Sequence, residues 1–247
     1  MNKVKTHLLL ALFSLPLIGW ISWQHVKAQG ADWLPVKYVR IEGAFQYISK
    51  RKIKTVIKEK LMNGLYNVDI QQIRQLLKHL PWVRKVTVKR VWPDAIIITI
   101  KEQVAIARWG KTDLLNRQGQ LFKPDNIKQF TQLPLLDGPA NNEKVLLSQM
   151  HKMSVALTEQ KLILTEFHVS ERRAWKLKLA NKMEINLGSK EQKKKFKRFL
   201  STFALIGAEQ IKKVRRVDLR YVNGYALTWK QGEDKIDWQQ VAELNKT

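Results

Sequence analysis

The apolar positions of this chain recur at two spacings, which separate helical segments from strands. One run follows Ser49 at helical spacing and comprises Ile53, Val56, Ile57 and Leu61. A second follows Asp69, with Gln72 completing a capping box, and comprises Ile73, Leu76, Leu77 and Leu80. Strands are predicted at Val36–Ile41, Val83–Arg90 and Ala95–Lys101. The order strand, helix, helix, strand, strand predicts a three-stranded sheet covered on one face by two helices.

From Ala105 onward the pattern changes to short β segments separated by turn residues. These segments are Leu114–Leu115, Gln120–Phe122, Leu162–Val169, Trp175–Leu179 and Met183–Leu187. Two helices interrupt them, one at Glu143–Leu157 and one that the capping box Ser189…Gln192 would start. The exposed face of the second helix is expected to carry Lys190, Lys193, Lys194, Lys195, Lys197 and Arg198. We interpret this face as a solubilising surface first, and as a surface for anionic lipid or cell wall second.

The last β signal is Val214–Trp229, which contains the hairpin or bulge dipeptide Asn223-Gly224. Before that dipeptide, Val217, Leu219 and Tyr221 share one face of the predicted strand. After it, Tyr225, Leu227 and Trp229 share a face. Residues 231–247 are polar and are predicted to form a flexible tail.

The N-terminus carries a membrane signal. Leu8–Trp23 contains no charged residue and follows Lys3 and Lys5. Residues 8–25 are therefore predicted to form a single-pass type II transmembrane helix, with residues 1–7 in the cytoplasm and the remainder exported. A cleaved signal peptide with a site at Val26-Lys27-Ala28 is the alternative, but Lys27 and the terminal Trp residues disfavour it.

Composition limits the classes of function. The chain of 247 residues has no cysteine, which excludes disulfides, thiol catalysis and cysteine-based zinc sites. Its formal net charge is +24, which would suit nucleic acid, anionic lipid, an anionic polymer or simple solubility. Export of the chain would remove nucleic acid as a physiological partner.

The residues that usually build active sites are scattered. The five histidines form no pair at metal-ligand spacing, and the chain has neither a Gly-rich phosphate loop nor a Gly-x-Ser-x-Gly motif. We therefore expect no catalysis, no cofactor, no metal and no small-molecule substrate.

Four motifs in order carry a family resemblance. They are Leu80-Pro81-Trp82-Val83 continued by Lys89-Arg90-Val91-Trp92-Pro93-Asp94 and Lys101–Trp109, Leu114-Leu115-Asn116 with Gly119 and Leu121-Phe122, Arg172-Arg173-Ala174-Trp175, and Val217–Trp229. Together with the N-terminal segment they resemble the FtsQ/DivIB family of bacterial cell-division proteins. The cytoplasmic tail of about seven residues is shorter than is usual in proteobacterial members of this family.

The resemblance implies an α+β protein with an N-terminal transmembrane helix, a linker at 26–35, a POTRA domain (β-α-α-β-β) at 36–104 and a mixed β domain at 105–230 that ends in an exposed β edge. It also implies a non-enzymatic scaffold of the divisome in the inner membrane, mostly periplasmic and enriched at the septum. The POTRA domain and membrane segment would contact other division proteins. The β domain would bind an FtsB–FtsL complex and so help to control septal peptidoglycan synthesis.

The resemblance assigns partner binding to Arg173, Arg220, Tyr221, Gly224 and Trp229. Their chemistry suits a sheet edge that accepts a second chain: aromatic anchors, a glycine that permits close approach, and arginines that bind carboxylates. Each residue also has a structural alternative. Tyr221 and Trp229 share their parity with core residues, Gly224 could serve a turn, and both arginines could be solvated surface charges.

Two other functions remain open at this point. The positive charge would suit a basic nucleic-acid-binding protein, although the chain has no helix-turn-helix or aromatic-basic motif. A POTRA-type segment would also suit an outer-membrane translocator, but no long run of barrel strands follows it.

Overall fold

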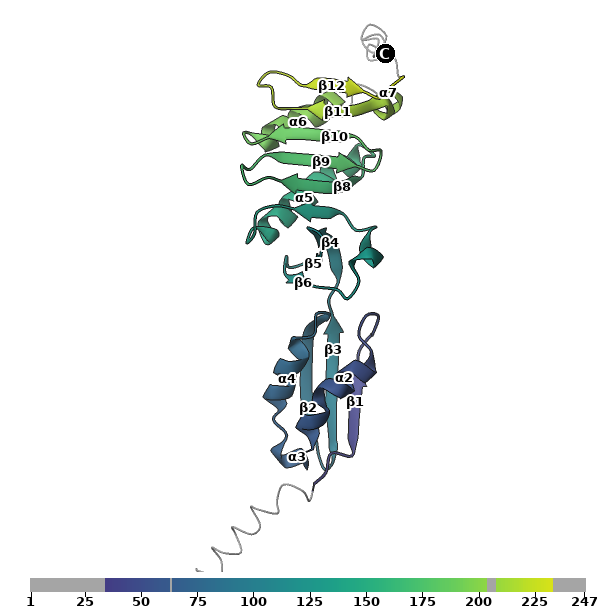
Figure 1. Ribbon diagram of the computed structural model, residues 1–247, viewed down its shortest axis with the longest axis vertical. Coiled ribbons are helices and arrows are strands. Elements are labelled where there is room, and N and C mark those ends of the chain that lie inside the picture. The colour runs from purple at the N-terminus through teal and green to yellow at the C-terminus, as the bar shows by residue number, and fades with distance from the viewer. Residues whose placement is uncertain (1–33, 63, 204–207, 233–247) are drawn as a thin grey trace, which may run out of the picture. The chain divides into compact units, whose positions relative to one another are not determined.

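The computed structural model describes residues 34–62, 64–203 and 208–232, which divide into two compact units between Gln103 and Val104 (Figure 1). The predicted anchor at 8–25 and the polar segment 233–247 lie outside these residues. Within the described ranges, no helix has the length and apolar composition needed to cross a membrane.

The first unit is a three-stranded sheet covered on one face by helices (Figure 1). Its strands are β1 (Tyr38–Glu42), β2 (Val83–Val91) and β3 (Ala95–Glu102), in the order β1-β3-β2. β1 runs parallel to β3, and β2 runs antiparallel to it. Helices packed on one face of a mixed sheet confirm the α+β prediction. Alternate residues of β3 are buried, as expected for a strand with one face on the core: Ile96, Ile98 and Ile100.

The helices of the first unit begin where their caps predict. α2 (Lys50–Ile57) starts after Ser49, whose hydroxyl accepts a hydrogen bond from the Lys52 amide, and continues as the 3₁₀ turn η1 (Lys58–Leu61). α4 (Ile70–Lys78) starts after Asp69, which accepts from the Gln72 amide at 2.9 Å. The short α3 (Gly64–Asn67) is not predicted by the apolar spacing, because Gly64 is more typical of a helix end than of a helix start.

The second unit is a nine-stranded sheet in the order β12-β11-β10-β9-β8-β7-β4-β5-β6. The strands are β4 (Ala105–Trp109), β5 (Asp113–Asn116), β6 (Leu121–Phe122), β7 (Leu135–Asp137), β8 (Leu164–Val169), β9 (Trp175–Leu179), β10 (Glu184–Gly188), β11 (Val214–Asp218) and β12 (Ala226–Trp229). β7–β8 and β10–β11 are parallel pairs, so each needs a crossover connection.

Helices provide those crossovers. α5 (Glu143–Glu159) connects β7 to β8, and α6 (Gln192–Phe203) with α7 (Ala208–Lys213) connects β10 to β11. α5 and α6 lie on the same face of the sheet (Figure 1). Their apolar stripes and the inward side chains of the strands form one core, whose largest buried residues are Phe167, Phe199 and Phe203. The 3₁₀ turn η2 (Ile127–Phe130) precedes β7.

Two expectations for the C-terminal part were wrong. α6 begins at Gln192, so Ser189 is not its N-cap, and the Gln192 side-chain amide instead donates to the carbonyl of Arg173 at 3.0 Å. The predicted strand from Val214 ends at Asp218, and residues 219–225 form a long connection rather than a tight Asn223-Gly224 hairpin. These residues determine the geometry of the candidate site.

Candidate partner-binding edge

β12 lies at one edge of the nine-stranded sheet, and in the described part of the chain β11 is its single strand neighbour. The two strands pair antiparallel, with Val217 opposite Leu227 and Asp218 opposite Ala226. Leu227 and Trp229 are half-buried against the core, whereas Ala226 and Thr228 are exposed. β12 is therefore held by the core beneath one face and by hydrogen bonds to β11 along one edge.

The connection from Leu219 to Tyr225, which we call the edge loop, follows β11 and precedes β12. It begins with the Leu219 amide donating to the carbonyl of Asn186 at 2.7 Å, and Leu219 is fully buried. Tyr221 and Val222 then project into solvent, with 58% and 76% of their surfaces exposed. Tyr221 thus does not share the buried face of Val217 and Leu219, and the core alternative for it is wrong.

Two cations of α6 hold the backbone of the edge loop. Arg198 donates to the carbonyls of Val222 at 2.5 Å, Gly224 at 3.0 Å and Tyr221 at 3.3 Å. Lys195 is buried and its Nζ donates to the carbonyl of Arg220 at 3.2 Å. Because a loop outside a sheet has no ladder partners for its carbonyls, these side chains supply the donors. We call Lys195 and Arg198 the clasp.

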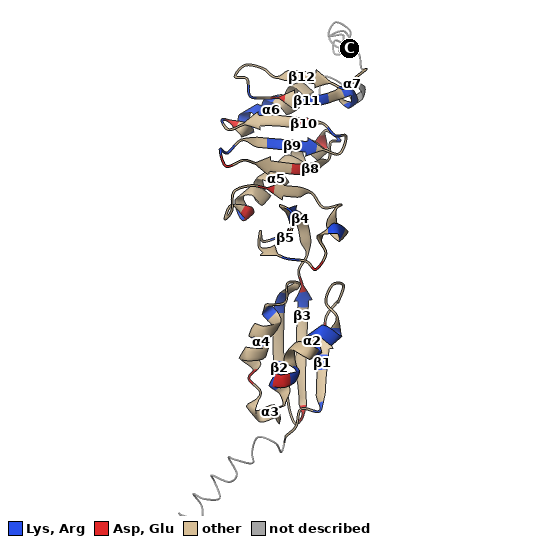
Figure 2. Ribbon diagram, in the orientation of Figure 1, with Lys and Arg blue, Asp and Glu red and all other residues tan. Residues whose placement is uncertain are grey.

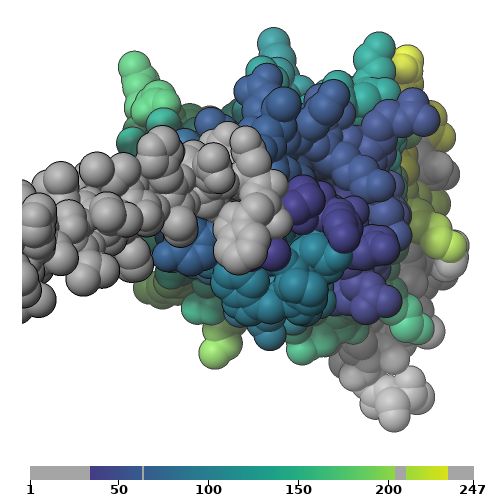
Figure 3. Space-filling model, turned by 90° about the horizontal axis from the view of Figure 1, so that it is seen from below, coloured from purple at the N-terminus to yellow at the C-terminus, as the bar shows by residue number. Residues whose placement is uncertain are grey.

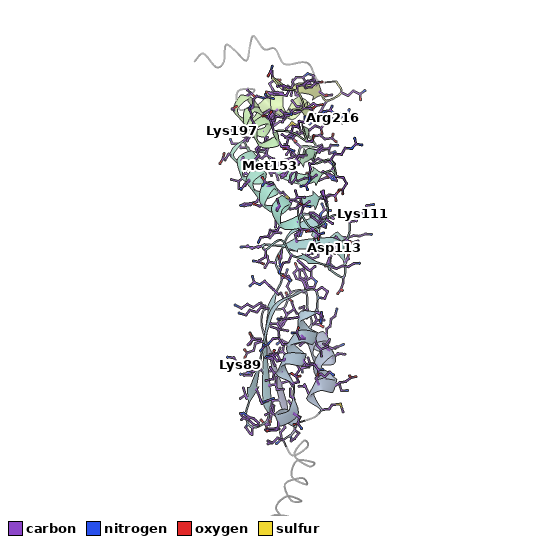
Figure 4. The ribbon with its side chains drawn as sticks, turned by 90° about the vertical axis from the view of Figure 1, so that its left-hand side faces the viewer. Lys89, Lys111, Asp113, Met153, Lys197 and Arg216 are labelled. Atoms are coloured by element: carbon purple, nitrogen blue, oxygen red, sulfur yellow. The ribbon has the colours of Figure 1, made fainter. Side chains whose placement is uncertain are left out.

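The clasp corrects the expectation that both residues belong to an exposed, solubilising face. Lys197 is exposed, as predicted, and lies on the face of the sheet that the helices cover. Arg216 lies on the opposite face (Figure 4). The sequence holds one signal of the difference. Position 195 lies one turn before the buried Phe199, on the stripe that α6 turns towards the core.

The Tyr225 side chain anchors the end of the edge loop. Its hydroxyl donates to Oγ1 of Thr202 at 2.9 Å, and its ring meets the Phe199 ring edge-on at 6.0 Å between centroids. The edge loop is therefore held to α6 by its last residue as well as by the clasp.

Arg220 is exposed but paired. Its guanidinium donates to both carboxylate oxygens of Asp218, with Nη2 to Oδ2 at 2.6 Å and Nε to Oδ1 at 2.9 Å. These bonds hold the pKa of Asp218 below its ordinary value, against the opposing effect of burial, and raise the pKa of Arg220. The stem of Arg220 also packs over Gly188, where an added Cβ would approach Cγ of Arg220 to 3.2 Å.

Arg173 lies in the turn between β8 and β9. Its backbone adopts φ +60°, its amide donates to the carbonyl of Ser170 at 2.8 Å, and its side chain is exposed. Arg220 borders a hollow of about 510 Å³ that is also lined by Ser170 and Ala174 of this turn. Arg173, Arg220, Tyr221 and Gly224 thus lie at one end of the sheet, where β8, β10 and β11 end and β12 begins.

Gly224 and Trp229 differ in their surroundings. A Cβ added at Gly224 would meet no described atom within 4 Å, and its φ lies outside the left-handed region, so the loop itself does not require glycine there. Trp229 lies at the far end of β12, opposite Val214, and is half-buried against the core. The structure therefore places four of the five predicted residues at the same end of the sheet and leaves Trp229 at the other end.

The sheet face away from the helices carries alternating charges in register. Glu166 faces Lys178, Lys178 faces Glu184 and Glu184 faces Arg216, on adjacent strands from β8 to β11. Burial raises the pKa of Glu184, but hydrogen bonds from Arg216 and Lys176 outweigh it, so the pKa lies below its ordinary value. On β12 the next position of this row is Thr228, which is uncharged.

The chain matches two family descriptions over nearly all described residues. Residues 34–103 match the POTRA domain, FtsQ-type, and residues 107–220 match the C-terminal domain of cell division protein FtsQ/DivIB. The cell division protein FtsQ of Methylomonas methanica is 45% identical over 228 residues, which cover 92% of each chain. FtsQ of Coxiella burnetii is 31% identical over 90% of this chain and 89% of its own length. FtsQ of Actinobacillus pleuropneumoniae is 32% identical over 85% and 90%, respectively.

The chain belongs to the FtsQ family of bacterial cell-division proteins. Its first unit is the FtsQ-type POTRA domain, and most of its second unit is the FtsQ/DivIB C-terminal domain, whose match ends at Arg220. A role in cell division follows, and the nucleic-acid-binding and translocator alternatives are set aside. Among the described residues of this FtsQ protein, no group of three or more His, Asp or Glu side chains could hold a metal ion.

Proposed function

We propose that this FtsQ-family protein is a non-enzymatic, membrane-anchored scaffold that binds an FtsB–FtsL-type complex by adding a strand of the partner to β12. The observation that carries the proposal is the edge position of β12, with β11 as its one neighbour in the described residues. An edge strand presents N–H and C=O groups that a second backbone can pair with. Binding there would transmit the state of the partner complex to septal peptidoglycan synthesis.

Residues next to β12, and others at the same end of the sheet, would give this docking its specificity. Tyr221 and Val222 offer exposed apolar surface next to the start of the strand, as interface anchors do. Open space over Gly224 leaves room for a partner backbone. Arg173 has no side-chain partner among the described residues and could bind a carboxylate of the partner, whereas Arg220 would have to share its guanidinium with Asp218.

Localisation forms part of the proposal. Residues 8–25 would hold the chain in the inner membrane, with both units in the periplasm and enrichment at the septum. The POTRA domain and the membrane segment would contact other divisome proteins.

The proposal is tested with the full chain and a purified FtsB–FtsL pair from the same bacterium. Tyr221→Ala should weaken binding at least about tenfold, because truncation of a central aromatic anchor costs about 2 kcal/mol or more. Val222→Ser should weaken it less. Val145→Ser on α5 is the matched control and should leave affinity unchanged. Val145 is 58% exposed, and α5 connects β7 to β8, which are separated from β12 by at least three strands.

Hydrogen exchange distinguishes strand addition from other docking. Complex formation should slow exchange of amides in 226–229, because outward-facing N–H groups of β12 would gain partners. Tight binding without that protection would rule out strand addition while leaving the interface intact. Equal effects of Val222→Ser and Val145→Ser on affinity would show that the interface does not include the edge loop.

A further inference from the structure

Four segments meet at one end of the first unit, which we call the N-proximal end: residues 34–38, 61–62, α3 and the β2–β3 turn at 91–95. The amides of Lys37 and Tyr38 both donate to the carbonyl of Asp94, at 2.9 and 3.2 Å. The Leu65 amide donates to the carbonyl of Leu34 at 2.7 Å. The described part of the chain therefore begins at this end, and Figure 3 looks onto it, with the earliest described residues in purple.

The N-proximal end exposes large apolar and aromatic side chains. The exposed fractions are 65% for Tyr38, 73% for Met62, 68% for Tyr66, 40% for Val91 and 55% for Trp92. Such a concentration on one end of a small domain marks a contact surface. At the opposite end of β3, by contrast, Tyr47 stacks on Trp82 at 3.9 Å between ring centroids, and the backbone amides of 46–48 are bound by Glu102.

Cations surround the same surface. A groove of about 530 Å³ runs between β1 and α2–η1, and Val36, Leu61 and Met62 line it together with Lys37, Lys54 and Lys58. The pairing of Lys37 with Asp94 is long, at 3.9 Å, and Lys54 and Lys58 have no side-chain partner among the described residues. Figure 2 shows the basic character of α2. Apolar surface bordered by lysines matches the headgroup region of a bilayer.

The chain preceding Leu34 limits what can cover this end. Between the predicted transmembrane helix, which ends at residue 25, and Leu34 lie eight residues, 26–33, which span at most about 30 Å when fully extended. The N-proximal end must then stay close to the bilayer surface. Tyr, Trp and Lys are the residues that favour that interface.

We infer that the N-proximal end docks on the membrane surface, with Tyr38, Met62, Tyr66 and Trp92 at headgroup depth and anionic phospholipid headgroups against Lys54 and Lys58. The inference rests on the membrane anchor of the proposed function. It gives the POTRA domain a lipid-bound orientation. Lipid headgroups then cover the start of β1 and the groove beside it, while the opposite end of β3 makes no lipid contact.

The chain has no cysteine, so single-cysteine labelling tests the contact directly. The full chain carrying Met62→Cys and an environment-sensitive fluorophore is placed in nanodiscs of phosphatidylcholine, with or without phosphatidylglycerol. A headgroup spin label should quench the fluorophore, and more strongly when phosphatidylglycerol is present. Gln46→Cys, exposed at the opposite end, is the matched control and should not be quenched.

A charge reversal tests the lysines. Lys58→Glu in the Met62→Cys chain should lower the ratio of docked to undocked domain at least about fivefold in phosphatidylglycerol discs, since each lysine near an anionic surface contributes about that factor. Arg51→Glu, earlier on α2 and towards the opposite end, should change the ratio much less.

The possible failures are distinguishable. A chain that does not elute with the nanodiscs overturns the anchor and this inference together. A chain that elutes with them while the fluorophore at position 62 stays unquenched overturns the inference alone. A fluorophore at position 62 that responds to the FtsB–FtsL pair, but not to the lipid quencher, shows that a protein covers this end and overturns the lipid contact.

Discussion

The two most basic of the described helices, α2 and α6, are similarly rich in Lys and Arg, but their cations make different contacts. α2 places Lys50, Arg51, Lys52 and Lys54 on exposed positions. α6 also carries a run of Lys and Arg, yet it buries Lys195 and turns Arg198 onto three carbonyls of the edge loop. Figure 2 shows the basic residues on both helices.

The difference comes from the neighbouring backbone rather than from the helices. Among the described residues, Lys54 of α2 is exposed and has no side-chain partner, so its ammonium group is available for solvent or for an anionic surface. α6 instead packs beside a connection of seven residues that leaves the sheet after Asp218 and has no ladder to satisfy its carbonyls. A positive run therefore becomes structural where unpaired carbonyls lie within its reach.

The largest effect is expected from Arg198→Ala, which removes three hydrogen bonds to the edge loop. Because bonds from a charged donor stabilise by about 1.5–3 kcal/mol, the free energy of unfolding should fall by about 2 kcal/mol in urea titrations. Exchange of amides in 220–224 should accelerate, and affinity for the partner should fall. Lys197→Ala on α6 and Arg51→Ala on α2 are the controls, each expected within about 0.5 kcal/mol of wild type. Equal losses of unfolding free energy in all three variants would show that the cations of α2 and α6 do not differ in their contribution to stability.

Lys195→Met should have a smaller effect. Methionine keeps much of the buried stem of Lys195 but cannot donate to the Arg220 carbonyl, which is one neutral acceptor. We expect a loss of about 1 kcal/mol, measured in the same urea titrations and compared with Lys194→Met at an exposed position. A stabilised Lys195→Met protein would mean that burial of the ammonium group outweighs its hydrogen bond.

The smallest effect is a pH dependence that the edge loop adds to the second unit. Arg220 holds the pKa of Asp218 below its ordinary value of 3.8, so the pair stabilises the fold above that value. The contribution should be lost as the pH falls below about 4 towards the folded pKa, and it should be small because solvent screens the exposed Arg220. Asp218→Asn should flatten the acid side of the stability curve measured from about pH 5 downward. Identical curves for both proteins would assign the acid response to other carboxylates.

The first unit was largely predictable because its local signals agree with its tertiary structure. Ser49 and Asp69 cap the helices that follow them, and the isoleucines of β3 alternate as a half-buried strand requires. The short elements of the second unit were less predictable. β7 and α7 are short, with three and six residues, and give no periodic signal long enough to distinguish from a loop.

The candidate site shows where sequence reasoning reaches its limit. Family motifs point to Arg173, Arg220, Tyr221 and Gly224, and the fold gathers these four at one end of the sheet. The exposure of Tyr221 cannot be derived from alternation, because alternation holds only while the strand continues and β11 ends three residues earlier. The sequence gives little sign of the clasp because it joins residues that are more than twenty positions apart, and only the packing of α6 against the edge loop brings them together.

The crossover through α6 and α7 has a consequence for biosynthesis. Among the described strands β12 pairs only with β11, and β11 pairs with β10, so the edge needs both strands, which follow the clasp helix α6 in the chain. A ribosome must translate beyond Trp229 before the edge exists. Nascent or prematurely terminated polypeptides that lack β11 and β12 would thus lack the proposed docking edge, although they contain the whole POTRA domain.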